Sequence, residues 1–178
     1  HSGYQFIYMA IKYLKKAIKK PETDDVKTRA AVQNILDDIE KRKEEAIKEL
    51  NKKFDKYEGE IIVSKEKIEE AIKKVDQKTK DDVQFAYERV RKFAEHQLKS
   101  MNNNFEVELS KGLFAGQRLI PVETAGCYIP GGRYAHISSA VMAITPAKVA
   151  GVEKIICASP PKGNDGANAG IIYAANLC

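Results

Sequence analysis

The stretch GCYIPGGRYAHISSA, residues 126–140, differs in character from the rest of the chain and contains the candidate functional residues. Small and apolar residues lead into Pro130-Gly131-Gly132, and Arg133 follows directly. A glycine-rich loop between a parallel strand and a helix lets backbone N–H groups approach a ligand, and the helix N-terminus beside it favours negative charge. The pattern differs from the Gly-x-Gly-x-x-Gly of dinucleotide sites. From these residues alone, a ligand cradle and a plain turn are both open.

Five side chains or backbone positions in this stretch are candidates for a role. We expect Tyr128 at the carboxyl end of a strand, where ligands of open α/β sheets gather. Gly131 and Gly132 supply a permissive backbone, so they are candidate binding residues together with Tyr128. Arg133 could pair with an anion through two parallel hydrogen bonds, or it could face solvent. A lone histidine such as His136 is more often a structural hydrogen-bonding residue than a ligand.

The pattern after residue 100 predicts the helices and strands around these residues. The order is strand, helix, strand, helix, which is typical of a parallel sheet with covering helices. Ser138 and Ser139 are candidate caps, Gly151 suits the left-handed position past a helix end, and Pro146 should kink its helix or begin a second segment. The expected elements are a strand over 125–129, a helix over 138–150, a strand over 155–158 and a helix over 168–178.

The first hundred residues predict helices that carry no visible chemistry. Apolar residues three or four apart predict one helix from Asp24 to Phe54, stopped by Gly59. Ser64 should cap a helix running to about Val75, and Thr79 to Asp82 fits a capping box. That second helix should turn Val83, Ala86, Val90, Phe93 and Ala94 inward. Short strands are expected over 60–63, 105–109 and 117–122.

Composition describes a globular protein with a real core. Hydrophobic residues make up 43% and charged residues 31% of 178 residues, and no apolar run is long enough to cross a bilayer. The net charge of +5 arises from basic residues interleaved with acidic ones, which favours a solvated helical surface over a nucleic-acid patch. The cysteines, Cys127, Cys157 and Cys178, form no CxxC or Cys/His cluster. We expect all three to be buried small hydrophobic residues in a reducing cytoplasm.

The domain organisation follows from a shift in charge near residue 100. Met9 is a more natural beginning than His1, so residues 1–8 are expected to be non-native or upstream residues. Residues 9–100 form a helical region, and residues 101–178 form an incomplete α/β domain. The last helix carries no stop signal and no third strand follows it, so the sequence predicts a chain cut in mid-domain. The predicted fold class is α/β, a helical amino-terminal region followed by the start of a truncated parallel-sheet domain.

Several motifs in this order resemble the histidinol dehydrogenase family. They are Gln117 to Val122, the run from Ala125 to Arg133, and Pro146 to Val152. The resemblance extends upstream through Lys53 to Asp55, Val63-Ser64 and Phe93 to Gln97, and covers essentially residues 9–178.

The resemblance implies a zinc- and NAD-dependent oxidoreductase with a Rossmann-like domain. Family members are cytoplasmic homodimers that oxidise a small alcohol, and histidinol dehydrogenase takes histidinol through the aldehyde to the acid in amino-acid biosynthesis. The tyrosine that matches Tyr128 contacts NAD in the family, which makes residues 101–178 part of an NAD-binding domain. The zinc ligands and the Glu-His acid/base pair of the family lie downstream of residue 178. No catalytic or metal-binding residue is therefore expected here, and the fragment alone should be inactive.

One departure concerns the substrate. Histidinol dehydrogenases usually follow Pro-Gly-Gly with a Thr-Ala-x-x-Pro-Ser segment, whereas this chain has Arg133-Tyr-Ala-His-Ile-Ser-Ser139. That variant is more similar to the branch acting on sulfopropanediol, a sulfonated diol. Arg133 becomes a candidate substrate contact, with the NAD pyrophosphate and solvent as its other partners. An alternative of another class is a non-catalytic helical interaction module that binds protein or nucleic acid. The resemblance implies neither nucleic acid nor membrane as a partner.

Overall fold

The computed structural model describes Lys15 and residues 26–101, 104–131 and 135–178. The chain divides into two compact units, His1–Lys43 and Glu44–Cys178. The change in composition near residue 100 thus falls inside the second unit. In the first unit, the described residues after Lys15 form helix α1 (Val26–Arg42), which buries none of its residues. Near its end the Arg42 guanidinium donates two 2.7 Å hydrogen bonds to the Asp38 carboxylate, and this lowers the pKa of Asp38.

The single helix predicted from Asp24 to Phe54 is wrong, because the chain is interrupted at Lys43. Lys43 adopts a φ of 55°, a left-handed conformation that ends α1. Helix α2 (Glu44–Leu50) and the π-helical turn η1 (Asn51–Asp55) follow it. Lys56, at φ 53°, ends this segment, so Gly59 does not stop a helix. An apolar period of three to four persists through one left-handed residue, which is why the pattern concealed the break.

Of the predictions for residues 60–82, two are wrong and one is confirmed. Residues 60–63 form no strand. Ser64 caps helix α3 (Lys65–Lys74), and its hydroxyl accepts a hydrogen bond from the Lys67 N–H at 3.3 Å. Helix α4 (Gln77–Ser100) begins three residues before the predicted capping box. Its cap is Asp76, whose carboxylate accepts from the Thr79 N–H at 2.9 Å.

Helix α4 turns a narrower face inward than the pattern predicts. Val83 and Ala94 are buried, and Val90 is partly buried against the core. Phe93, predicted to face inward, is 67% exposed. Arg89 lies over the ring of Phe85, another exposed residue of this helix, at 3.1 Å from the centroid.

An antiparallel hairpin follows α4. Strands β1 (Phe105–Ser110) and β2 (Leu113–Gln117) pair with Phe105 opposite Gln117. The turn contains Gly112 at φ 79°, and the Gly112 N–H donates to the Glu108 carboxylate at 2.8 Å. The strand predicted over 117–122 is wrong, because the tight turn fixes the second strand immediately after Gly112. Every residue of both strands is exposed.

The parallel unit predicted from the sequence is confirmed. Strands β3 (Thr124–Tyr128) and β4 (Lys154–Ala158) pair in parallel, and helix α5 (Ile137–Val149) connects them. The helix runs through Pro146 as one segment. It ends in a Schellman motif, in which Gly151 at φ 87° donates to the Lys148 carbonyl and Val152 donates to the Ala147 carbonyl.

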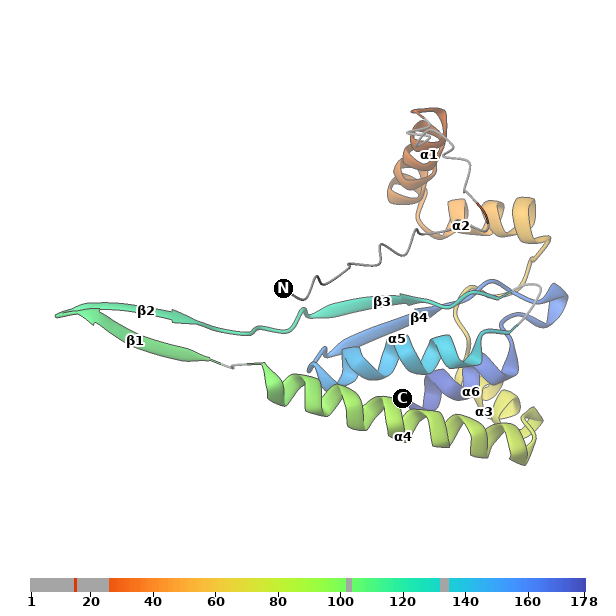
Figure 1. Cartoon of the computed structure of the whole chain (residues 1–178). Helices are drawn as coiled ribbons and strands as arrows, with labels where there is room; N and C mark the ends of the chain where they lie inside the picture. The colour runs from red at the N-terminus through yellow and green to blue at the C-terminus, as the bar shows by residue number, and fades with distance from the viewer. Residues whose placement is uncertain (1–14, 16–25, 102–103, 132–134) are drawn as a thin grey trace, which may run out of the picture. The chain divides into compact units, whose positions relative to one another are not determined.

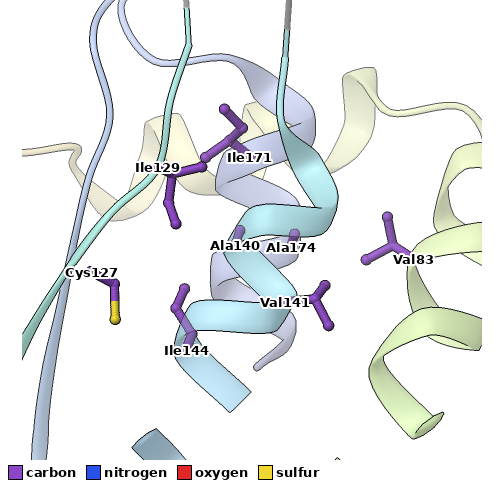
Figure 2. Close-up of a cluster of buried hydrophobic side chains, with 8 residues drawn as sticks. All are labelled: Val83, Cys127, Ile129, Ala140, Val141, Ile144, Ile171 and Ala174. Carbon is purple, nitrogen blue, oxygen red and sulfur yellow. The ribbon is translucent and has the colours of Figure 1, made fainter. Parts of the chain in front are cut away.

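Helix α5 lies at the centre of the second unit. It contacts both strands of the sheet, helix α4, and helix α6 (Ala169–Leu177), which in turn packs on α3 (Figure 1). Figure 2 shows the core that results, where side chains from the sheet and from three helices meet. Its members are Val83, Cys127, Ile129, Ala140, Val141, Ile144, Ile171 and Ala174. The small residues Ala140 and Ala174 are fully buried, which lets α5 and α6 approach closely.

The two faces of the β3–β4 sheet differ in burial. Cys127 is buried on the face covered by α5. On the opposite face Tyr128 is 69% exposed and Ile156 is 49% exposed, and a Cβ added at Gly126 would meet nothing within 4 Å. Parallel sheets usually have both faces covered. In the described residues, this second face is open.

Candidate functional site

The carboxyl edge of the β3–β4 sheet places Tyr128 where the sequence predicted it. Tyr128 is the last residue of β3 and lies opposite Ala158, the last residue of β4. The next N–H, from Ile129, donates to the Ala158 carbonyl at 2.8 Å and continues the ladder. Ile129 is fully buried while Tyr128 is largely exposed. The buried isoleucine therefore anchors the strand end, and the tyrosine ring is presented to solvent beside it.

The loops after the two strands are in close contact. A Cβ built on Gly131 would lie 3.0 Å from Pro160 Cγ and 3.2 Å from Ser159 Oγ. The structure therefore brings Gly131 and Tyr128 to the same edge of the sheet. Gly132 and Arg133 lie outside the described residues.

The starts of the two helices meet at the same edge. The N-cap of α5 is His136, so the prediction that Ser138 and Ser139 are caps is wrong; both lie inside the first turn. No side chain in the described part of the chain caps the α5 backbone N–H groups, whereas Asn168 Oδ1 caps α6 by accepting from the Gly170 N–H at 2.9 Å. A Cβ on Gly170 would collide with Ile137 at the start of α5. The edge thus presents one capped and one uncapped helix N-terminus.

Tyr57 supports the loop between β4 and α6, and no pattern around Tyr57 predicts this role. Tyr57 is 8% exposed, and its hydroxyl donates to the Glu60 carbonyl at 3.2 Å. The same hydroxyl lies 3.2 Å from the position of a Cβ on Gly166, a residue at φ 78° and ψ −149°. Only the Asp165-Gly166 pair, a common turn dipeptide, marked this loop in the sequence.

The three cysteines do not share one environment as predicted. Cys127 is buried, but Cys157 is exposed and Cys178 is partly buried. Cys127 and Cys157 are register partners across β3 and β4, a proximity that their sequence separation concealed. Although Cys157 is exposed, partial desolvation of its thiol raises the pKa, and the nearby Cys127 and Cys178 thiols raise this pKa further. A raised pKa lowers the fraction of the reactive thiolate at a given pH.

Within residues 26–101, 104–131 and 135–178, no group of three or more His, Cys, Asp or Glu side chains is placed to hold a metal ion. A hollow of about 530 Å³ lies on the hairpin, and its lining contains neither Tyr128 nor Gly131. Its lining residues are Asn104, Phe105, Glu106, Gly116, Gln117 and Arg118.

No helix in the described part of the chain is both long enough and apolar enough to span a membrane.

Comparison with known proteins identifies the family of this chain. The family model of histidinol dehydrogenase matches residues 18–178. The structure is similar to the crystal structure of histidinol dehydrogenase from Elizabethkingia anophelis, with a TM-score of 0.77 and 29% identity over 93% of this chain and 36% of that one. The chain belongs to the histidinol dehydrogenase family.

Two curated relatives illustrate the range of the family. A histidinol dehydrogenase homolog of Pelagibacter ubique is 67% identical over 96% of this chain and 40% of its own length. Sulfopropanediol 3-dehydrogenase of Ruegeria pomeroyi is 46% identical over 96% of this chain and 39% of its own length. The chain therefore spans about two fifths of the curated relatives that it matches.

Proposed function

We propose that the protein carrying this chain is a zinc- and NAD-dependent dehydrogenase that oxidises a small alcohol to the acid. The chain supplies one wall of the NAD site in this proposal, as the amino-terminal part of the enzyme. The observation that carries it is the carboxyl edge of the sheet, where exposed Tyr128 ends β3, the Gly131 loop follows it, and α5 begins without a side-chain cap. Family membership over residues 18–178 supports the oxidoreductase class.

The residues at this edge fit the chemical groups of NAD. The Ser159 hydroxyl is buried and has no hydrogen-bond partner in the structure, so the described edge retains unused polar capacity. The first N–H groups of α5 favour an anion such as a pyrophosphate, because helix N-termini combine free donors with a positive dipole end. The exposed ring of Tyr128 offers an apolar surface against which a base or ribose can pack. NAD, when bound, supplies the acceptor for the hydride removed from the alcohol.

Zinc does not fit the described residues, since they contain no ligand cluster. The proposal therefore takes the zinc ligands and the acid/base pair from parts of the protein outside this chain, and no step of the reaction is assigned to residues within it. The chain's own contribution is binding and orientation. We expect a homodimer of the full-length protein, as the family resemblance implies.

The proposed substrate is a sulfonated diol such as sulfopropanediol. The loop sequence from Arg133 to Ser139 and the 46% identity with sulfopropanediol 3-dehydrogenase support this choice. A guanidinium can bind a sulfonate through two parallel hydrogen bonds, and histidinol has no such anion. Histidinol is the other candidate substrate, because relatives named histidinol dehydrogenase reach 44% identity. The interaction-module alternative gains no support, since the family match includes the helical region.

The test is a steady-state assay of the full-length protein. We expect zinc-dependent reduction of NAD with sulfopropanediol, at a kcat/KM at least tenfold above that with histidinol. Efficient oxidation of histidinol but not of sulfopropanediol would contradict the proposed substrate, whereas the proposed class of reaction would still hold. Failure to reduce NAD with either alcohol, in a folded and zinc-loaded protein, would contradict the proposed function.

A further inference from the structure

Gly131 is a glycine for a steric reason that involves the loop after the neighbouring strand. Its φ does not lie in the left-handed region, so its backbone conformation is open to other residues. The space where a side chain would begin is instead filled. Three atoms lie within 3.3 Å of an added Cβ, namely Pro160 Cγ, Ser159 Oγ and Pro160 Cδ.

The groups that fill this space have little freedom to move. Two of the three close atoms belong to the rigid ring of Pro160, and Pro161 follows it. The third belongs to Ser159, whose hydroxyl is buried. Ser159 also follows directly on Ala158, whose carbonyl accepts from the Ile129 N–H. The loop after β4 is thus held to the sheet on one side and pressed against Gly131 on the other.

We propose that Ser159 and Pro160 are positioning residues that fix the Pro130-Gly131 backbone, and through it the cofactor-binding edge that begins at Tyr128. This inference rests on the proposed function, and it assigns Gly131 a different part from direct approach to the ligand. A side chain at position 131 would point at the loop after β4, so glycine is needed there to let the two loops pack together. Ser159 and Pro160 themselves act through Gly131 and need not touch the cofactor.

A side chain at position 131 should therefore displace one loop from the other. Contacts of 3.0–3.3 Å are tighter than ordinary van der Waals contact, so Gly131→Ala requires a shift of a few tenths of an ångström at the edge. Overpacking of this kind perturbs the local structure. We expect Gly131→Ala to weaken NAD binding about tenfold, a change readily resolved by titration.

The experiment is a double-mutant cycle in the full-length protein. The four proteins are the wild type, Gly131→Ala, Pro160→Ala and the double variant, and the two measurements are the Kd for NAD by calorimetry and the Tm without NAD. Pro160→Ala removes both ring atoms that crowd position 131. Added to Gly131→Ala, it should restore most of the lost affinity and raise the Tm above that of Gly131→Ala, although it should improve neither quantity in the wild type.

The outcomes separate this inference from the proposed function. Recovery of both quantities in the double variant supports the loop contact. Losses that simply add, or a Gly131→Ala protein that binds NAD like the wild type, would overturn it. If the folded wild type does not bind NAD, the proposed function fails, and so does the assignment of Ser159 and Pro160 to a cofactor edge. In that case, a rescue of the Tm of Gly131→Ala by Pro160→Ala would support only the packing contact between the two loops.

Discussion

Gly166 combines a backbone conformation that favours glycine with a close neighbouring side chain, so an added methyl group there should be costly. Its φ of 78° and ψ of −149° lie in a region populated essentially by glycine alone, where a side chain costs about 1–3 kcal/mol. A Cβ would also lie 3.2 Å from the Tyr57 hydroxyl, which is held by its bond to Glu60. Loss of that hydrogen bond adds about 0.5–1.5 kcal/mol. Alanine also lowers the conformational entropy of the unfolded chain, which stabilises the folded protein by about 0.4–1 kcal/mol. We therefore expect Gly166→Ala to destabilise by about 1–3 kcal/mol net.

The assay is urea unfolding of the full-length protein, with Gly163→Ala as the matched control in the same loop. Gly163 has a φ of 57°, and a Cβ there would meet nothing within 4 Å. The control should cost about 1 kcal/mol, the usual penalty for a left-handed non-glycine residue. Adding Tyr57→Phe should not rescue Gly166→Ala, because most of the strain lies in the backbone. Equal midpoints for Gly166→Ala and Gly163→Ala, or full rescue by Tyr57→Phe, would refute this reasoning.

Three further predictions concern the cap of α6, a thiol and the substrate. Asn168→Ala should cost about 0.5–2 kcal/mol in urea unfolding and Asn168→Asp much less, because an aspartate oxygen still accepts from the Gly170 N–H; equal losses would argue against the cap. The pKa of Cys157 is raised, so its thiolate forms at higher pH than that of free cysteine, and iodoacetamide should label it more slowly at pH 8 in the native protein than in urea; equal rates would contradict this. Arg133→Lys in the full-length enzyme should lower kcat/KM for a sulfonated diol about ten- to a hundredfold while the Kd for NAD changes less, and a larger loss of NAD affinity would place Arg133 on the cofactor instead.

The parallel unit could be predicted because its signals are local and strong. Gly151 marks the end of α5, Asn168 marks the start of α6, and apolar runs mark both strands. The position of Tyr128 at the strand end follows directly from that order. The predicted helix and strand boundaries were wrong where a single residue or a contact distant in sequence determines the structure. Lys43 breaks a helix without disturbing its apolar period, and the turn at Gly112 moves a strand by several residues.

The contacts between loops at the candidate site could not be predicted from the sequence. Nothing in the local pattern predicts that Gly131 packs on Pro160. Gly131 follows β3 and Pro160 follows β4, so the two meet only when these strands pair in register. Tyr57 is hidden for the same reason, since its contact with Gly166 spans most of the second unit. Such pairs become visible only through tertiary structure.

The most direct test of the central claim is the Kd for NAD of full-length Tyr128→Ala, measured by calorimetry beside Thr124→Ala. Thr124 is an exposed residue at the other end of the same strand, so it controls for general damage to β3. Because Tyr128 is 69% exposed, its removal should barely alter the Tm. Loss of a contact between an aromatic ring and a base costs about 1–3 kcal/mol, so the account predicts NAD binding about tenfold or more weaker in Tyr128→Ala and unchanged in Thr124→Ala. An unchanged Kd in a folded Tyr128→Ala protein would contradict the assignment of this sheet edge to NAD.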